Sequence, residues 1–330
     1  MNRRKLLKQT GLLTISSLLP FSAVRAFNTS QKLTTASIGH FRFKLGDLEM
    51  VVVTDGHIFI NPTQPIFAPG ISKERLQAAL KENFITDDAI DAAINILVII
   101  KGERIILIDT GSGSALGNNS GHFLKNLQAA GIQPEKVTDI LITHLHIDHI
   151  GGILKEQGEP VFKNAIYHLP EVEHNFWMSQ KPDFSKSKNP ASPLDSIKLA
   201  RKIVNAIADK LHLFPFGTTL FDCVKSEQAG GHTPGHPLLT VFSGEKYLRH
   251  IVDLVHTPLL LSHPEWGTQW DTDFHMGVHT RQRLLKKLAL SKELVMSCHL
   301  PWPGLGYIAA DKIGYRWVPL AVSTPQLYSE

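Results

Sequence analysis

The chain has 330 residues, of which 43% are hydrophobic and 19% are charged, and this length is sufficient for one large globular domain with a buried core. Its formal net charge of +4 originates at the N-terminus, because residues 1–26 contain five of the 34 basic residues and none of the 30 acidic ones. The remaining 29 basic and 30 acidic residues nearly balance, which argues against nucleic acid or an anionic membrane as a partner.

The first 26 residues have the pattern of an export signal. Residues 2–8, Asn-Arg-Arg-Lys-Leu-Leu-Lys, precede an uncharged, mostly apolar stretch at residues 11–24, as in twin-arginine signal peptides. A transmembrane anchor is the alternative, but the apolar stretch is shorter than the roughly 20 residues that span a bilayer and contains Pro20. We therefore expect a mature domain of residues 27–330, periplasmic or secreted, with no membrane attachment after processing.

The N-terminal half of this domain alternates strand and helix patterns. Two pairs of apolar runs favour β-hairpins, the first with a turn at Gly46-Asp47. Ser72 is a suitable N-cap for a helix that ends near Asn83, and a second helix should stop at Gly131. Strands are expected at residues 41–44, 48–54, 95–100, 104–108 and 137–143, and helices at residues 72–83 and 121–130.

The C-terminal half continues the alternation after a polar, proline-containing loop at residues 181–193. Two groups of strands with helices between them predict a mixed α/β domain in which two sheets pack face to face and helices cover the outside. The helices are expected at residues 194–209 and 280–290, and the strands at residues 219–224, 238–242, 247–252 and 294–297.

Four metal-binding side chains lie within residues 143–149, Thr-His-Leu-His-Ile-Asp-His. His144 and His146 are two positions apart, so they point to the same side of an extended chain that leaves the end of a strand. Asp148 and His149 lie where the chain turns away, so they are able to face a second point close to the first. Imidazole and carboxylate are ligands for zinc and its first-row neighbours. A solvated surface loop is the alternative, but the Asp-His pair and the preceding strand favour a metal site.

Three later residues are candidates to complete a two-metal site. His232 lies in residues 230–236, Gly-Gly-His-Thr-Pro-Gly-His, where glycines and a proline permit a tight loop. Asp253 and His299 each come directly after a predicted strand. Strand ends hold side chains rigidly at one edge of a fold, so we expect these residues to meet the run at residues 143–149.

With these motifs in place, the mature chain resembles the metallo-β-lactamase superfamily, from Thr54-Asp55-Gly56 and Asp109-Thr110-Gly111 through to His299. The resemblance implies a single-domain, four-layer αββα sandwich of the α/β (α+β) class. It also implies two divalent metal ions, for which zinc is favoured while iron, manganese or cobalt stays open. The first ion would be bound by His144, His146 and His232, the second by Asp148, His149 and His299, and both by Asp253.

Other motifs narrow the resemblance to one branch. The broad-spectrum β-lactamases of the superfamily have a cysteine where this chain has Asp253, so an antibiotic substrate is not expected. Residues 297–307, 314–319 and 175–180 resemble the methyl parathion hydrolase branch, which includes exported organophosphate hydrolases, lactonases and aryl-esterases. Leu116 stands where methyl parathion hydrolase has an aromatic pocket residue, and this departure favours a lactone or ester substrate over a phosphotriester.

The resemblance and general metal chemistry together give a mechanistic hypothesis. Two metal ions lower the pKa of a shared water, and the resulting hydroxide attacks a lactone or ester carbonyl. Asp148 is the candidate to hold this hydroxide and pass a proton to the leaving group, although a purely ligating Asp148 stays open. Asp109 and Asp55 are candidates to orient a ligand histidine, with turn capping as the alternative. The candidate pocket residues are Trp177, Phe176 and Leu116.

Several alternatives stay open from the sequence. A main activity as an organophosphate hydrolase, a glyoxalase II-like thioesterase and a mono-iron persulfide dioxygenase are the competing functions, although the strand-and-loop tail does not resemble the helical domain of glyoxalase II. We expect a small-molecule substrate and leave a homodimer open. Cys223 and Cys298 are too few for a disulfide framework, so two buried thiols are expected, with a single bridge as the alternative. Further histidines are expected to be structural or solvent-facing: His236, His256, His263, His275 and His279.

Overall fold

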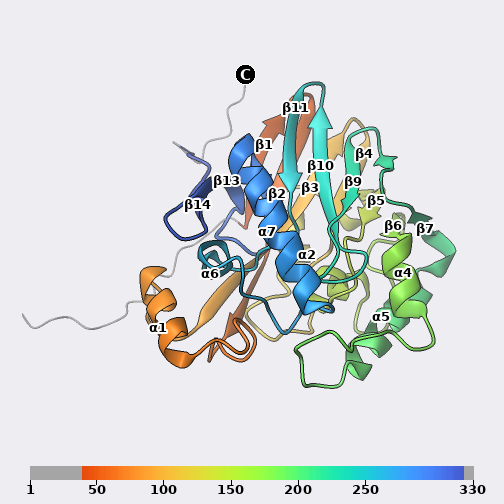
Figure 1. Cartoon of the computed structure of the whole chain (residues 1–330). Helices are drawn as coiled ribbons and strands as arrows, with labels where there is room; N and C mark the ends of the chain where they lie inside the picture. Colours follow the sequence, from red (N-terminus) through yellow and green to blue (C-terminus); the bar gives the residue numbers. More distant parts are fainter. Residues whose placement is uncertain (1–38, 323–330) are drawn as a thin grey trace, which may run out of the picture. The chain divides into compact units, whose positions relative to one another are not determined.

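A computed structural model describes residues 39–322 and contains two seven-stranded sheets (Figure 1). The first sheet has its strands in chain order: β1 (His40–Leu45), β2 (Leu48–Ile60), β3 (Ile90–Lys101), β4 (Arg104–Ile108), β5 (Asp139–Leu141), β6 (Ile166–Pro170) and β7 (Leu211–Phe214). The second sheet does the same: β8 (Thr219–Leu220), β9 (Val224–Gln228), β10 (Pro237–Ser243), β11 (Lys246–His250), β12 (Val295–Met296), β13 (Leu305–Ala310) and β14 (Tyr315–Pro319).

Helices cover the outer faces of both sheets. On the first sheet lie α2 (Phe123–Ala129), α4 (Glu171–Met178) and α5 (Leu194–Ala206). On the second sheet lie α6 (Pro258–Ser262) and α7 (Phe274–Ser291), and α1 (Lys73–Glu82) packs beside them against the ends of β2 and β3. A short helix, α3 (Ile147–Ile150), follows β5. The predicted four-layer αββα sandwich is therefore confirmed for the described residues.

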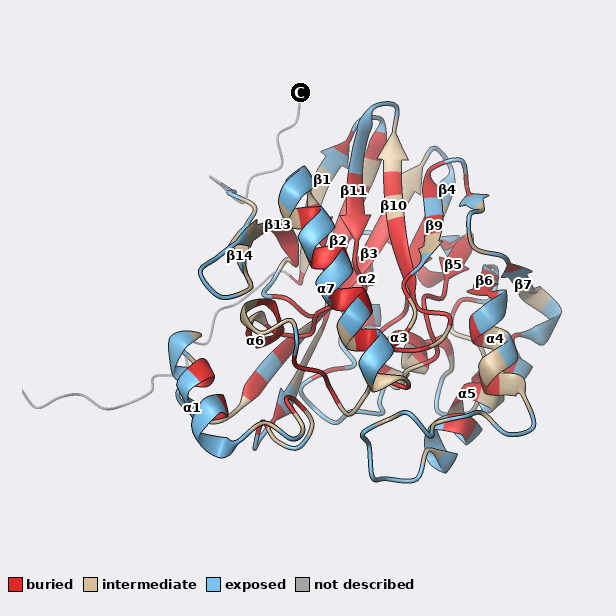
Figure 2. Ribbon diagram, in the orientation of Figure 1, coloured by how far each residue is buried: buried red, intermediate tan, exposed pale blue. Residues whose placement is uncertain are grey.

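Alternation along the strands sorts the apolar side chains into three layers. In β2, Met50 faces the layer between the sheets, whereas Val51 faces the helices on the first sheet. In β10, Leu239 joins the layer between the sheets and Leu238 faces the helices on the second sheet. Figure 2 shows the resulting pattern, with buried strands and helices whose outer faces are exposed. Both faces of each sheet are thus used for packing, which leaves the strand ends and loops for function.

The structure corrects two of the expected elements. The strand predicted at residues 219–224 is wrong, because Phe221 and Asp222 both have φ of 54°, and this left-handed backbone separates β8 from β9. The helix expected to begin near Thr280 begins at Phe274, where the Asp273 side chain accepts a hydrogen bond from the Met276 N–H. No bounds were predicted for β6, β7, β9, β13 and β14, which are runs of four to six residues.

Other expectations concern the chain termini and the cysteines. The predicted export signal and the mature N-terminus at residue 27 lie outside the described residues and stay predictions. Within residues 39–322, none of the helices combines the length and the apolar character that a membrane span requires. Cys223 and Cys298 are both buried and free, as expected.

Asp55, in the middle of β2, forms hydrogen bonds with the connection between β4 and α2 rather than with a candidate ligand histidine. Its carboxylate accepts hydrogen bonds from the N–H (2.9 Å) and hydroxyl (2.7 Å) of Ser112, and from the N–H groups of Gly121 (3.1 Å) and Phe123 (2.9 Å). The side chain is fully buried. The interpretation of Asp55 as a residue that orients a ligand histidine is therefore replaced by its alternative, turn capping.

We predict that Asp55→Asn lowers the free energy of unfolding by about 2–4 kcal/mol, because an amide NH₂ must then face buried N–H donors. Chemical denaturation would measure this loss. Asp47→Asn, at an exposed turn, is the control and should leave the stability within about 0.5 kcal/mol of the parent. Bound metal per chain should not change, and an unaltered denaturation midpoint in Asp55→Asn would contradict the prediction.

Candidate metal centre

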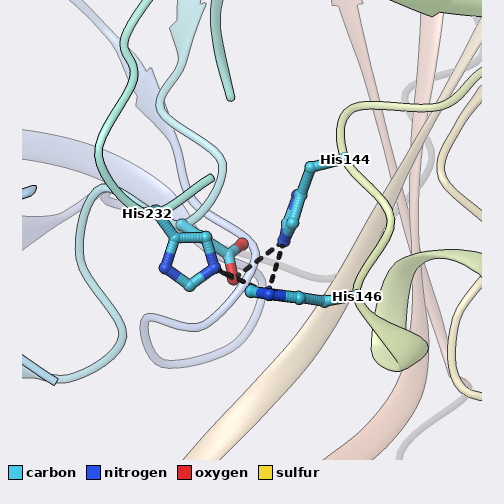
Figure 3. Close-up of side chains that lie close together, drawn as sticks. His144, His146 and His232 are labelled. Carbon is cyan, nitrogen blue, oxygen red and sulfur yellow. Dashed lines mark hydrogen bonds and ion pairs between the residues drawn. The ribbon is translucent and has the colours of Figure 1, made fainter. Parts of the chain in front are cut away.

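The histidine run leaves the edge of the first sheet and turns into a short helix. The backbone is extended through His146, with φ of −79° and ψ of 154°, and α3 begins at the next residue. Asp148 and His149 therefore lie on α3, where the chain turns away from the strand. Figure 3 shows the rings of His144, His146 and His232 directed toward one another.

The first ligand group contains His144, His146, His232 and Asp253. The Nδ1 atom of His146 lies 3.1 Å from His144 Nε2 and 2.9 Å from His232 Nε2. The Oδ2 atom of Asp253 lies 3.3 Å from His232 Nε2 and 3.7 Å from His144 Nε2. A tetrahedral ion about 2.0–2.1 Å from each donor holds its donors about 3.3 Å apart, so these spacings suit one ion.

The second ligand group contains Asp148, His149 and His299, again with Asp253. The Oδ2 atom of Asp148 lies 3.4 Å from the Nε2 atoms of both His149 and His299. Asp253 reaches His149 Nε2 through Oδ1 and His299 Nε2 through Oδ2, at 3.2 Å in each case. Asp253 therefore takes part in both groups, and all seven candidate ligands lie at one centre.

Buried, unpartnered atoms test whether this centre fits metal ions. His149 Nε2 and Asp253 Oδ1 are buried and lie 3.2 Å apart, but neither atom makes a hydrogen bond of acceptable geometry among the described residues. A buried polar atom without a partner costs free energy, whereas a bound cation would satisfy both atoms at once. The donor set of imidazole nitrogens and carboxylate oxygens is also one that zinc prefers. The residues present therefore fit two divalent ions.

Two candidate ligands of the second group, His149 and His299, are oriented by hydrogen bonds at their Nδ1 atoms. Asp109 Oδ2 lies 2.7 Å from His149 Nδ1, and the same carboxylate accepts the Thr143 N–H (2.8 Å) and hydroxyl (2.7 Å). His299 Nδ1 donates to the Ala93 carbonyl at 2.7 Å. These contacts leave the Nε2 atom of each ring directed at the centre. Asp109 thus lies where the sequence placed it, beside a ligand histidine.

Asp271 orients His232, a candidate ligand of the first group, in the same way. The sequence analysis did not identify this residue. Its Oδ1 atom lies 3.0 Å from His232 Nδ1, and its Oδ2 atom lies 3.5 Å from the Arg281 guanidinium on α7. Arg281 is itself buried and donates to the Leu254 carbonyl at 2.8 Å. The spacing of the sequence gives no signal for this contact, because Asp271 precedes no glycine-rich loop and follows no predicted strand.

Charges within the centre move the pKa values of its ligands in opposite directions. Burial alone would lower the pKa of His232, but Asp253 and Asp271 raise it to about 9. Burial, with the nearby His232 ring, lowers the pKa of His146 to about 3. Burial would raise the pKa of Asp253, but His149 and His299 hold it well below its usual range. The Asp253 carboxylate is therefore ionised and available as a ligand.

A cavity of about 360 Å³ opens over the centre. Its floor is formed by His146, Asp148, His232 and Asp253. The volume lies in the range of small-molecule sites. Its apolar walls include Ile58, Leu116, Trp177, Phe184, Leu199 and Trp270, and its polar residues include Ser187, Asn189, Ser192 and Gln269.

The cavity walls include two of the three predicted pocket residues. Trp177 is buried beside His146, and Leu116 is partly exposed at the wall. Phe176 does not line the cavity, because its ring packs against Trp177 and Phe184. Phe184, which lies in the loop at residues 181–193, takes the place in the wall that was expected for Phe176.

The remaining histidines are divided between buried and exposed positions. His236 is buried, and its Nε2 atom accepts the Asp253 N–H at 3.0 Å. His256 is also buried, with Nε2 3.2 Å from Asp253 Oδ2 and its ring parallel to that of His299 at 5.2 Å. His263 stacks on Trp266. The exposed members are His275 and His279.

Comparisons with known proteins agree with this geometry. A family model described as the metallo-beta-lactamase superfamily matches residues 90–298. AidC, described as a dizinc quorum-quenching lactonase in complex with the product N-hexanoyl-L-homoserine, is 38% identical, with a TM-score of 0.82 over 87% of this chain and 99% of AidC. No curated protein matches the chain.

Two further solved structures extend the comparison. AbOPH, described as a hydrolase in the beta lactamase superfamily, is 29% identical, with a TM-score of 0.79 over 88% of this chain and 100% of AbOPH. A probable metal-dependent hydrolase from Staphylococcus aureus is 19% identical, with a TM-score of 0.67 over 86% of this chain and 100% of that one. Because the Staphylococcus aureus hydrolase is only 19% identical, its similarity to this chain concerns the fold alone.

We predict that metal loading at pH 7 releases at least about one proton per chain, because a metal ion displaces the proton that His232, with its pKa of about 9, carries at that pH. The sign follows from the raised pKa: the proton competes below pH 9, so metal affinity falls as the pH falls. Calorimetric titration in buffers of different ionisation enthalpy would count the protons. The release should decrease as the pH rises through 9 and should be unchanged in the exposed control His279→Ala. Equal release at pH 7 and pH 10 would contradict it.

Proposed function

This chain belongs to the metallo-β-lactamase superfamily, and we propose that it is a two-metal lactonase that opens N-acyl homoserine lactones. As a member of the superfamily it is a metal-dependent hydrolase. The likeness to AidC supports the choice of a lactone, because that lactonase was solved with an acyl homoserine as its product. The observation that carries the proposal is the pair of complete ligand groups, shared through Asp253, at the floor of a largely apolar cavity.

The candidate ligands would hold two divalent ions in the two groups described above. When bound, such ions polarise a carbonyl oxygen and lower the pKa of water toward neutrality. Asp148 and Asp253 are the two carboxylates that line the cavity, and Asp253 contacts both ligand groups. Asp148 is therefore the candidate to hold the attacking water. The water oxygen bonds to the lactone carbonyl carbon, the ring C–O bond breaks, and Asp148 passes the water proton to the leaving oxygen.

The cavity walls support an acyl chain as the second part of the substrate. Leu116, Trp177 and Phe184 present apolar surface beside the metal ligands. Burying an alkyl chain against such surface contributes about 0.8 kcal/mol per CH₂ group. Ser187 and Asn189 at the same cavity offer hydrogen-bonding groups for an amide. The methyl parathion hydrolase branch stays part of the proposal through the resemblance of its motifs, with phosphotriesters as secondary substrates.

We predict that a substrate panel, run on protein of measured metal content, gives the highest kcat/KM for N-hexanoyl homoserine lactone. The panel would include an aromatic lactone, an aryl ester, S-lactoylglutathione and methyl parathion. Activity should disappear with a chelator and return with zinc. A preference for methyl parathion or the glutathione thioester would replace the proposal by that activity, and a single bound iron would favour the dioxygenase. If no compound turned over, the lactonase proposal would be rejected while the fold stood.

We predict that Asp148→Asn lowers kcat by about 10²- to 10⁴-fold while two metal ions stay bound, because the amide keeps an oxygen ligand but does not transfer a proton. Metal content and steady-state kinetics on the same sample would test this. Asp195→Asn, on the exposed first turn of α5, is the control and should keep full activity. Full turnover with full metal would remove the proton-transfer role, and loss of metal would leave Asp148 as a ligand only.

A further inference from the structure

Glu173, on the first turn of α4, is a buried acidic residue outside the candidate ligand set. Its Oε1 atom accepts hydrogen bonds from the Leu145 N–H at 3.0 Å and from the Trp177 indole N–H at 2.7 Å. Its Oε2 atom accepts a hydrogen bond from the Gly235 N–H at 2.9 Å. Three N–H donors from three parts of the chain therefore converge on one carboxylate.

Two of these donors belong to the loops that carry the first ligand group. Leu145 lies between His144 and His146, and Gly235 lies in the same tight loop as His232. The carboxylate thus links the backbone of one ligand loop to the backbone of the other. Burial raises the pKa of Glu173, whereas the hydrogen bonds from Leu145, Trp177 and Gly235 lower it, because they stabilise the ionised form. Three bonds to one acceptor make the link between the loops a firm one.

The close approach at Gly235 shows how tightly the second loop is held against α4. A Cβ atom placed on Gly235 would lie 2.4 Å from the backbone nitrogen and 2.4 Å from the Cβ atom of Glu173. Any side chain at this position would push the loop away from the carboxylate. The glycine of the Thr-Pro-Gly sequence is therefore required for contact with Glu173, beyond its role in forming a tight loop.

We propose that Glu173 is a positioning residue for metal binding, which fixes the distance between the histidine pair His144 and His146 and the single histidine His232. It touches none of the candidate ligand side chains in the contacts described above and acts through the two backbones. The second ligand group has separate supports, Asp109 behind His149 and the Ala93 carbonyl behind His299. Loss of Glu173 should consequently weaken the first metal site and spare the second.

The test is a stepwise cobalt(II) titration of Glu173→Gln, followed by visible absorption and repeated for zinc with a competing chelator. The glutamine is isosteric, but one of its ends is an NH₂ group, which must face either the Gly235 N–H or the other two donors. We expect the dissociation constant of the first site to rise by about 10- to 100-fold, with the second site within about two-fold of the parent. Glu171→Gln, exposed on the same turn of α4, is the matched control and should bind both ions normally.

Two further measurements separate this role from simple packing. Trp177→Phe removes one donor but keeps both loop contacts, so its first-site affinity should stay within a few-fold of the parent. In the unmodified protein, amide hydrogen exchange at Leu145 and Gly235 should be slow even without metal, because the carboxylate holds these N–H groups.

Parent-like affinity for both ions in Glu173→Gln, or equal weakening of both sites, would overturn the proposal. If Glu173→Gln does not fold, rapid exchange at both amides in the metal-free parent would overturn it, and slow exchange would support it. These readouts concern metal binding alone, so they are independent of the lactonase proposal.

Discussion

The geometry of the candidate metal centre depends on one buried carboxylate, Asp253, which lies between the imidazoles of the two ligand groups. Asp253 Oδ1 and Oδ2 lie 3.2–3.7 Å from Nε2 atoms of four ligand histidines. Burying this carboxylate and these imidazoles together costs free energy unless cations lie between them. The same arrangement that would bind two ions is therefore unfavourable without them. Metal binding would offset this cost, while the backbone of the loops at Leu145 and Gly235 is held separately by Glu173.

Backbone strain directs the carboxylates of this centre. Val252, directly before Asp253, has φ of 49°, and Asp109 has φ of 69°. Left-handed backbone at residues other than glycine costs about 1–3 kcal/mol and persists only where neighbours hold it. Here the Asp253 N–H donates to His236 Nε2 and the Asp109 N–H donates to the Leu141 carbonyl. His236, which was expected to be structural or solvent-facing, holds the turn that directs the Asp253 carboxylate.

The sequence predicted those parts of the centre that depend on local spacing. His144 and His146 are two residues apart on extended backbone, and this alone indicates that they share a side. Asp271 and Glu173 were not predicted, because their contacts with the loop of His232 and Gly235 span 39 and 62 residues and no periodicity indicates such contacts. The same reason explains Asp55, whose role depends on a connection 57 to 68 residues further along the chain.

The fold was predictable to a similar extent. The β-branched and apolar runs that form β2 to β4 indicated strands, and their grouping indicated two sheets. The break between β8 and β9 was not predicted, because Phe221 does not favour left-handed backbone, although Asp222 is of a residue type that is enriched there. The conformation of Phe221 follows from tertiary packing, because its side chain is buried and its ring meets His168 on β6 edge to face. Such a contact overrides the local preference for a continuous strand.

The two ligand groups also differ in how they are connected to the cavity. Trp177 lines the cavity, meets His146 edge to face at 6.0 Å and donates its indole N–H to Glu173. One wall of the cavity and the first ligand group therefore share a support. By contrast, Leu116 and Asn189 line the cavity from loops that carry none of the seven candidate ligands. Changes at those two positions alter the walls without contact to a ligand loop. Trp177, by contrast, contacts both His146 and the carboxylate of Glu173, and that carboxylate still links the two ligand loops when the indole N–H is lost.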